Sequence, residues 1–388
     1  MLRGDSVPSF KHDRVTPAQI IILGFLLLIF TGAVLLMLPF STQEPGGASF
    51  GDALFTATSA TCVTGLVLHD TALYWSPFGQ LVILLLIQVG GMGVVTIAVA
   101  IFMFAGKRIG LKQRWVMQES ISAPQVGGIV RMTGFILKPP FDRRVGSCFW
   151  PAVLPAIWSW KRTLVRGVSS VSAFCNAGFD LMGVNSPFSS LTDYVGDPLV
   201  SNVIAFLIII GGVGFLTWND IREHKLHFRR YRLQSKLILT TTLALILTGL
   251  LFFLLYEFEQ GQWVDMSLWE RINAAFFQSV TPRTAGFNTV DLTGLSQPAQ
   301  LLIILLMLVG GSPGSTAGGF KTTTLAVMLL GIRAVFRHKE RPQCFGRRIA
   351  DESIRNASAI FLLYLLLFLT GGHPDLLHRW RTPDGGAV

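Results

Sequence analysis

Charged residues are scarce in this sequence, and their scarcity excludes most classes of soluble protein. Only 14% of its 388 residues are Asp, Glu, Lys or Arg, whereas a soluble globular domain carries about 25%. Hydrophobic residues account for 51%, and the mean hydropathy is +0.54. The composition therefore predicts a polytopic membrane protein rather than a soluble enzyme.

The sequence also lacks the residue patterns of a cofactor site or an active site. Its four cysteines are irregularly spaced, which indicates neither a disulfide framework nor a metal site. A glycine cluster at residues 90–93 lies inside an apolar stretch and follows no strand, so it is weak support for nucleotide binding. The long apolar stretches carry no converging set of His, Asp, Glu or nucleophilic Ser. We therefore expect no cofactor in this chain and no enzymatic activity.

Uncharged apolar stretches predict membrane-crossing helices, because about 20 apolar residues cross roughly 30 Å of hydrocarbon. Six such stretches lie at residues 20–40, 76–105, 199–218, 237–256, 292–320 and 356–372. Lys and Arg gather near residues 3–14, 107–114, 222–236 and 333–355, whereas loops 41–76 and 180–198 contain neither residue. Short cytoplasmic loops hold the excess of Lys and Arg. We therefore expect an all-α, multi-pass protein with a cytoplasmic N-terminus.

The formal net charge of +10 is explained by these inner flanks. Basic residues beside membrane helices contact lipid headgroups, so we expect membrane lipid and no nucleic acid as a partner. Docking of a cytoplasmic partner is the alternative for these loops.

Three segments of the sequence repeat without gaps. They cover residues 59–66, 172–179 and 280–287, and their central glycines, Gly65, Gly178 and Gly286, are 113 and 108 residues apart. A short amphipathic run precedes each segment, at residues 50–59, 166–173 and 269–279. A double-glycine element follows each one, at residues 89–93, 210–214 and 309–314. The unit therefore reads as an outer helix, a short re-entrant helix, an extended stretch and a glycine-rich second helix.

The repeated glycines predict an ion path lined by backbone. Non-helical backbone at membrane depth is tolerated only where protein buries it or water bathes it. Rings of backbone carbonyl oxygens can replace the hydration shell of a monovalent cation, and glycine takes positive φ at little steric cost. A single segment of this kind is explained more simply by a glycine that ends a short helix. Three copies favour the ion path.

These residues resemble the potassium-translocating subunits of the Ktr/Trk/HKT superfamily, specifically its KtrB-like branch. The resemblance rests on the segments 61–65, 175–179, 281–287 and 310–322, and it covers most of residues 15–138 and 168–372. In that family, units of an outer helix, a pore helix and a second helix (M1-P-M2) surround one pseudo-fourfold pore. The resemblance therefore implies potassium uptake through a filter that coordinates the ion by backbone carbonyls. Sodium is the candidate coupling ion, while glycine at position 65 favours potassium as the ion carried.

The resemblance also assigns the site residues one by one. The ion filter comprises Thr61, Cys62, Val63, Thr64, Gly65, Cys175, Asn176, Ala177, Gly178, Arg283, Thr284, Ala285 and Gly286. The second helix (M2) of repeat 3 is expected to break in a gate loop. The gate loop comprises Gly310, Gly311, Ser312, Pro313, Gly314, Ser315, Thr316, Ala317, Gly318, Gly319 and Lys321. Several glycines and a proline cannot hold a continuous helix, although a plain kink is the alternative.

Family members work as homodimers on a cytoplasmic ring of nucleotide-binding regulatory subunits, in the bacterial inner membrane. The expected organisation is a cytoplasmic N-terminus (1–16), repeat 1 (17–106), repeat 2 (125–220), repeat 3 (232–336, broken at 310–324), the first helix of repeat 4 (349–372) and an anomalous tail (373–388).

Two stretches depart from this pattern. Residues 139–166 should form an apolar outer helix but contain prolines and basic residues, and residues 373–388 turn polar abruptly. The repeat spacing puts a fourth glycine at about position 395, beyond Val388, so we expect an incomplete fourth unit. We hypothesise out-of-frame translation of both stretches; a divergent helix and a natural short form are the alternative. A nonconducting truncated remnant of a potassium transporter subunit, or a secondary solute transporter with broken helices, is accordingly the alternative function.

Individual side chains near these segments carry further expectations. We expect Cys62 and Cys175 to pack behind the filter, and Arg283 to lie there paired with Glu270. Lys321 is expected to face cytoplasmic water. Asp70 and Asp291 each follow a filter glycine by five residues, where they either concentrate cations or are ordinary solvated acids.

Overall fold

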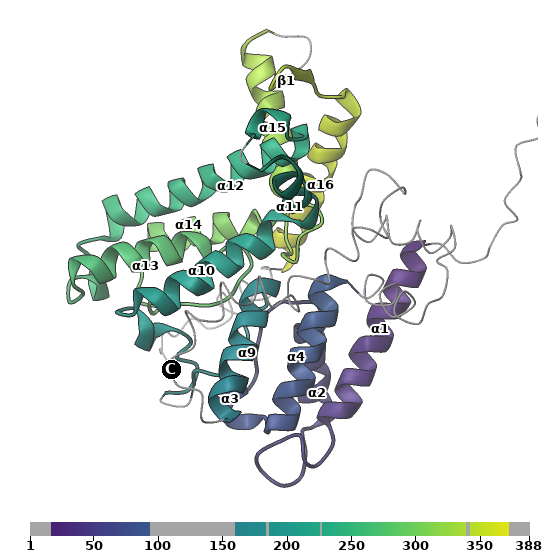
Figure 1. Cartoon of the computed structure of the whole chain (residues 1–388), viewed down its shortest axis with the longest axis vertical. Coiled ribbons are helices and arrows are strands. Elements are labelled where there is room, and N and C mark those ends of the chain that lie inside the picture. Colours follow the sequence, from purple (N-terminus) through teal and green to yellow (C-terminus); the bar gives the residue numbers. More distant parts are fainter. Residues whose placement is uncertain (1–16, 94–159, 184–185, 226, 339–341, 372–388) are drawn as a thin grey trace, which may run out of the picture. The chain divides into compact units, whose positions relative to one another are not determined.

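The structure is a computed structural model, and it describes residues 17–93, 160–183, 186–225, 227–338 and 342–371 (Figure 1). The chain divides into two compact units, Met1–Ser189 and Ser190–Val388. The N-terminal stretch 1–16, most of the anomalous stretch 139–166 and the tail 373–388 lie outside the described residues. The expectations placed on those stretches, including out-of-frame translation, therefore stay predictions.

The described part of the first unit is a group of helices (Figure 1), and several small side chains are buried in its core. Its helices are α1 (Pro17–Leu36), α2 (Phe50–Thr61), α3 (Thr71–Tyr74), α4 (Pro77–Met92) and α9 (Trp160–Cys175). Helices α1, α2 and α4 pack against one another, and α4 packs against α9. Ala33, Ala53, Ala57 and Ala60 are fully buried in this core. Small residues let helix backbones approach closely, which is the packing expected inside a membrane.

The second unit contains the remaining described elements. Its α-helices are α10 (Pro198–Val213), α11 (Phe215–His224), α12 (Leu233–Phe252), α13 (Leu268–Val280), α14 (Gln297–Leu308), α15 (Thr322–Phe336) and α16 (Asp351–Gly371). Short turns of 3-10 helix lie at Thr192–Tyr194, Phe228–Arg230 and Gly261–Trp263, and a π-helical turn, Phe253–Glu257, extends α12. Strands β1 (Gln343–Cys344) and β2 (Arg347–Arg348) form an antiparallel hairpin between α15 and α16.

The described residues are mostly helical, which confirms the predicted all-α class. Within these ranges three helical segments are long and apolar enough to cross a membrane, at residues 19–36, 233–257 and 351–370. Their outer faces expose large apolar side chains, including Leu23, Leu27 and Leu363, as helices that face lipid do. The pseudo-fourfold arrangement of repeated units stays a prediction.

The apolar stretch 199–218 does not form the single straight helix that its hydropathy predicts. Helices α10 and α11 meet at an angle of 95°. Gly214 lies at the bend with a φ of 91°, a value that glycine adopts without steric cost. A Cβ atom at this position would lie 2.8 Å from the Pro313 carbonyl oxygen. Hydropathy indicates neither feature, so it could not predict the bend at Gly214; that this stretch crosses the membrane stays a prediction.

The double-glycine element of α4 is explained by the segments that pack on it. A Cβ atom at Gly90 would lie 1.9 Å from the carbonyl oxygen of Thr61, at the end of α2. At Gly91 it would lie 2.9 Å from the Cys175 sulfur, at the end of α9. The two glycines therefore let α4 support the ends of both short helices.

We expect Gly90→Ala to destabilise the protein, because the new methyl group would collide with the backbone of Thr61. Overpacking of this kind costs about 1–3 kcal/mol. Gly51→Ala is the matched control, since Gly51 is also helical and its nearest neighbour to a Cβ atom is the Ser49 hydroxyl at 3.8 Å. Thermal unfolding of the purified protein in detergent measures the difference. Equal melting temperatures for the two variants would contradict this account of the glycine.

Candidate ion filter and intramembrane loop

The same backbone conformation follows each of the three short helices α2, α9 and α13. In each segment two residues, separated by one, have positive φ, and the second of them is the repeated glycine. The pairs are Val63 (58°) and Gly65 (78°), Asn176 (57°) and Gly178 (73°), and Thr284 (66°) and Gly286 (84°). The repeat seen in the sequence is therefore a repeat of backbone geometry.

The first residue of each pair, and not the glycine, ends the helix in the first two segments. The Val63 N–H donates to the Ala60 carbonyl (3.3 Å), and the Thr64 N–H donates to the Ser59 carbonyl (2.9 Å). The second segment has the same bonds, from Asn176 to Ala173 (3.1 Å) and from Ala177 to Ser172 (2.8 Å). These paired bonds form a Schellman motif, with a left-handed residue just after the helix. The explanation that the repeated glycines merely end helices is therefore wrong.

The third segment has the same pair of positive φ values but different bonds. The Thr284 N–H donates to the Pro282 carbonyl (2.7 Å), and the Ala285 N–H donates to the Thr281 carbonyl (3.0 Å). Sequence reasoning missed the positive φ at Val63, Asn176 and Thr284. Of the three residue types, only asparagine is enriched at positive φ, and for the β-branched Val63 the conformation is a genuine outlier.

Alternating signs of φ have a direct chemical consequence. In an ordinary extended strand successive carbonyls point in opposite directions, whereas residues of alternating handedness turn them toward one side. A positive φ costs about 1–3 kcal/mol of backbone strain at a residue other than glycine, and it persists where the surrounding structure enforces it. The arrangement suits a row of carbonyl oxygens offered to a cation.

Hydroxyl groups tie two of the segments back to their helices. Ser59 Oγ donates to the carbonyl of Leu66 (2.7 Å), the residue after Gly65. Thr281 Oγ1 donates to the carbonyl of Phe287 (2.5 Å), the residue after Gly286. Each bond spans the whole segment, so it fixes the strand between its two ends.

The first two segments lie against each other within the first unit. A Cβ atom at Gly65 would lie 2.5 Å from the Ala177 carbonyl oxygen and 3.4 Å from the Gly178 Cα. The third segment, Arg283–Gly286, belongs to the second unit, where Gly319 of the glycine-rich loop approaches Thr284. Convergence of all three segments on one axis stays a prediction.

Two expectations about side chains behind the filter need correction. Cys175 is buried as expected, with Gly91 of α4 against its side chain, but Cys62 is exposed. Arg283 is buried, and its Nη2 lies 3.4 Å from Thr242 Oγ1 of α12. Glu270 instead forms a capping box with Ser267 at the start of α13. Helix α13 separates Glu270 from Arg283 by about 15 Å, so the expected pairing was wrong.

Carboxylates beyond the filter glycines bind backbone amides. Asp70 Oδ1 accepts from the N–H groups of Ala72 (2.8 Å) and Leu73 (3.1 Å), and its Oδ2 accepts from that of Phe188 (2.8 Å). Asp291 Oδ1 accepts from the side chain and the N–H of Thr293, and these bonds lower the pKa of Asp291. Both groups therefore organise loops; their effect on cations stays a prediction.

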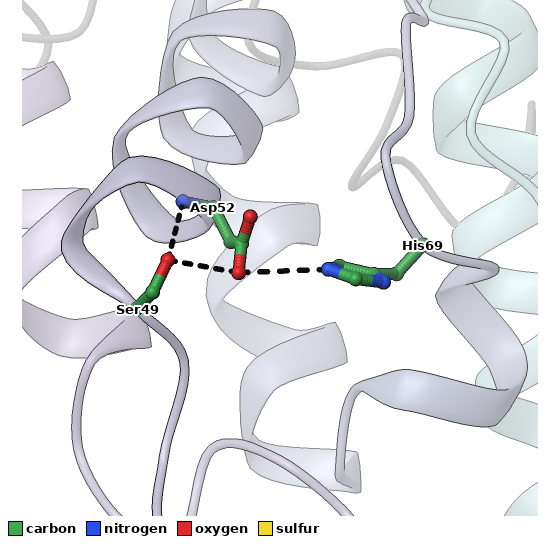
Figure 2. Close-up of polar contacts among 3 residues, drawn as sticks. All are labelled: Ser49, Asp52 and His69. Atoms are coloured by element: carbon green, nitrogen blue, oxygen red, sulfur yellow. Dashed lines mark hydrogen bonds and ion pairs between the residues drawn. The ribbon is translucent and has the colours of Figure 1, made fainter.

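A polar group that sequence reasoning missed lies at the outer end of the first segment (Figure 2). Asp52 Oδ2 accepts from the hydroxyl of Ser49, the N-cap of α2 (2.8 Å), and lies 3.6 Å from His69 Nε2. The His69 ring also stacks on Tyr74, with centroids 4.0 Å apart. Figure 2 shows His69 reaching from the loop after the filter to the start of α2. Helix α2 and the segment that follows it are thus joined at both ends.

The glycine-rich segment 309–321 is a closed loop between α14 and α15. Its two ends pair, through a bridge between Val309 and Phe320 and a bond from the Gly311 N–H to the Gly318 carbonyl (3.1 Å). Lys321 Nζ donates to the carbonyls of Ala317 (2.9 Å) and Gly318 (3.4 Å). The Lys321 ammonium therefore binds carbonyls of its own loop, and the expectation that it faces cytoplasmic water stays a prediction.

The loop is bonded to the elbow between α10 and α11. The Ser312 N–H donates to Gly212 (3.0 Å), and the Thr316 N–H donates to Gly211 (3.3 Å). In the opposite direction, the Phe215 N–H donates to the Gly314 carbonyl (2.9 Å). Alignment of the double-glycine elements gave no sign of this contact, because equivalence in a repeat does not predict which copies touch.

Comparisons with known proteins identify a matching family and several relatives. Residues 159–373, more than half of the chain, match the family described as "TrkH: Cation transport protein". The chain is 38% identical to the potassium/sodium uptake protein NtpJ of Enterococcus hirae over 358 residues, which are 92% of this chain and 78% of that protein. It is 39% identical to the Ktr system potassium uptake protein B of Bacillus subtilis over 365 residues, 93% of this chain and 80% of that protein.

A solved structure has a similar fold. The crystal structure of the potassium transporter TrkH from Vibrio parahaemolyticus matches with a TM-score of 0.67 and 20% identity. The match covers 93% of this chain and 72% of that one.

We expect Ser59→Ala and Thr281→Val to lower the melting temperature, because each removes the hydroxyl that ties a segment to its helix. The expected loss is about 1 kcal/mol for each variant. Ser279→Ala is the control, since the Ser279 hydroxyl bonds only to Phe276 within its own helix (2.8 Å). Thermal unfolding in detergent measures all three. If Ser279→Ala costs as much as the other two, the hydroxyl bonds across the segments have no special role.

Proposed function

The chain belongs to the TrkH family of cation transport proteins and, within it, to the KtrB-like branch, and from this premise we propose that it carries potassium through a filter of backbone carbonyls. The filter residues are those of the three segments 61–65, 175–178 and 283–286. They act through carbonyl oxygens that replace the water lost by the entering ion. The alternation of positive φ in all three segments is the observation that carries this proposal.

Potassium is the proposed ion, and sodium is a candidate for coupling. Glycine at all three filter positions leaves the carbonyls unobstructed by side chains. The relatives are named for potassium uptake, and one of them for potassium and sodium. Accordingly, sodium dependence of potassium uptake is the property to measure once uptake is established.

The closed loop 310–321 is the proposed gate. It interrupts apolar helices with polar backbone, and Gly319 lies against Thr284 of the third filter segment, with 3.5 Å between a Cβ atom at Gly319 and Thr284 Cγ2. A loop in that position obstructs an ion leaving the filter. It stays compact because its ends pair and because Lys321 binds its free carbonyls. A plain kink would need neither feature.

The proposed setting is the bacterial inner membrane, with M1-P-M2 units around a pseudo-fourfold pore and the N-terminus in the cytoplasm. Within the second unit, Phe228 of the basic loop before α12 contacts Phe345 of the basic hairpin, with ring centroids 5.9 Å apart. Lys236 Nζ lies 5.7 Å from the centroid of the Phe345 ring. These contacts support a common, cytoplasmic side for both basic loops. A homodimer on a cytoplasmic ring of nucleotide-binding subunits is the proposed assembly.

We expect Gly65→Ala and Gly178→Ala to lower potassium uptake at least about tenfold, a loss of roughly 1.4 kcal/mol at the barrier. An added methyl group strains the positive φ, and at Gly65 it also collides with Ala177. Gly167→Ala is the control, because Gly167 lies in α9 and nothing lies within 4 Å of its Cβ position. Growth of an uptake-deficient host on low potassium and rubidium uptake measure the effect.

These variants also separate the carbonyl filter from a transporter whose site is lined by side chains. Such a site would tolerate the methyl group at Gly65 or Gly178. Uptake that persists in both variants, with normal amounts of protein in the membrane, would refute the filter.

A further inference from the structure

Helix α11 binds the loop 309–321 at its N-terminal end, and Asp220, farther along α11, binds the start of α12. At the start of α11 the Phe215 N–H donates to Gly314, while the Gly211 and Gly212 carbonyls of α10 accept from the loop. These carbonyls belong to the last turn of α10, where a helix leaves its acceptors without partners. Trp218 Nε1 donates across the elbow to the Ile210 carbonyl (2.9 Å). The elbow and the loop are therefore one hydrogen-bonded assembly within the second unit.

A buried carboxylate fixes α11 to the start of the membrane-crossing helix α12. The Asp220 side chain is buried, and its Oδ2 accepts from Ser235 Oγ (2.6 Å) and from the Arg232 N–H (3.1 Å). Asp220 Oδ1 also lies 3.5 Å from Arg232 Nε. Arg232 is the N-cap of α12 and offers no cap from its own side chain. Asp220 therefore supplies the cap of α12 from another helix.

An aspartate is well suited to bind the N-terminus of a helix. The N-terminus of a helix has free N–H groups and a partial positive charge, so a carboxylate is favoured there. A carboxylate without these partners would be costly in a buried place. Asp220 is consequently stable only while α11 stays docked on α12, and the docking in turn fixes the direction in which α11 leaves the elbow at Gly214.

We infer that Asp220 is a positioning residue for the intramembrane loop: by docking α11 on α12, it holds the elbow whose backbone binds Ser312, Gly314 and Thr316. The inference about position rests on these contacts alone. Its consequence for transport rests on the proposed function of the loop as a gate. A cytoplasmic event that moves the chain between α11 and α12 would reach the loop along this route.

The test compares three variants of the whole chain: Asp220→Ala, Asp220→Asn and a control variant that removes the cap of a different helix. Asp197→Ala is the matched control, because Asp197 caps the opposite end of α10 through the N–H groups of Leu199 (3.0 Å) and Val200 (3.3 Å). Deuterium exchange is followed in peptides that cover residues 309–321. We expect exchange to accelerate roughly tenfold in Asp220→Ala, the effect of weakening one buried hydrogen-bonded contact. Asp220→Asn keeps an acceptor for Ser235 and should restore most of the protection.

Potassium uptake is the second readout. We expect Asp220→Ala to raise the maximal rate of uptake and to leave the half-saturating potassium concentration unchanged, because the filter segments are not touched. If Asp220→Ala does not fold, Ser235→Ala provides the same comparison, since it removes one bond to the same carboxylate.

Unchanged exchange in 309–321 would overturn the inference, and so would equal acceleration in Asp197→Ala, which would indicate general loosening. Failure of the proposed function is a separate result: accelerated exchange in Asp220→Ala, with no potassium uptake by the unaltered protein, would support the positioning role and refute the transport role.

Discussion

The structure depends above all on the need to satisfy backbone polar groups in a medium without water. An unpaired N–H or carbonyl in hydrocarbon costs several kcal/mol, so non-helical backbone survives there only with partners inside the protein or in a wet cavity. The filter segments and the glycine-rich loop meet this requirement with main-chain bonds, hydroxyl groups and the Lys321 ammonium.

Close approach of two backbones explains where several glycines lie. A Cβ atom between the two backbones would prevent that approach. Gly90 against Thr61, Gly310 against Gly318 and Gly65 against Ala177 are three such meetings of backbone with backbone. The double-glycine elements thus look alike in sequence yet serve different neighbours.

The sequence predicted those features that depend on the composition and spacing of residues along the chain. Apolar length predicted the three described helices that are long enough to cross a membrane, and spacing of the glycines predicted three equivalent segments. It could not predict the 95° bend between α10 and α11, the bond between Arg283 and Thr242, or the cap that Asp220 gives to α12. Each of these depends on a partner 12 or more residues away or in another helix, and no periodicity or residue type encodes that partner. Positive φ at Val63 was also hidden, since residue preference argues against it.

The filter segments and the loop satisfy their backbone groups in different ways, and this difference bears on the proposed mechanism. Each filter segment is bonded mainly to the helix that precedes it, through Ser59 in the first unit and Thr281 in the second. The loop is bonded to itself and to the elbow at Gly214, which is a neighbouring element. A loop that carries its own internal bonds can change its position by exchanging three bonds to the elbow, while the filter bonds stay intact. Under the proposed function, selection of the ion and control of its passage could therefore be altered independently, because a move of the loop breaks no hydrogen bond within the filter segments.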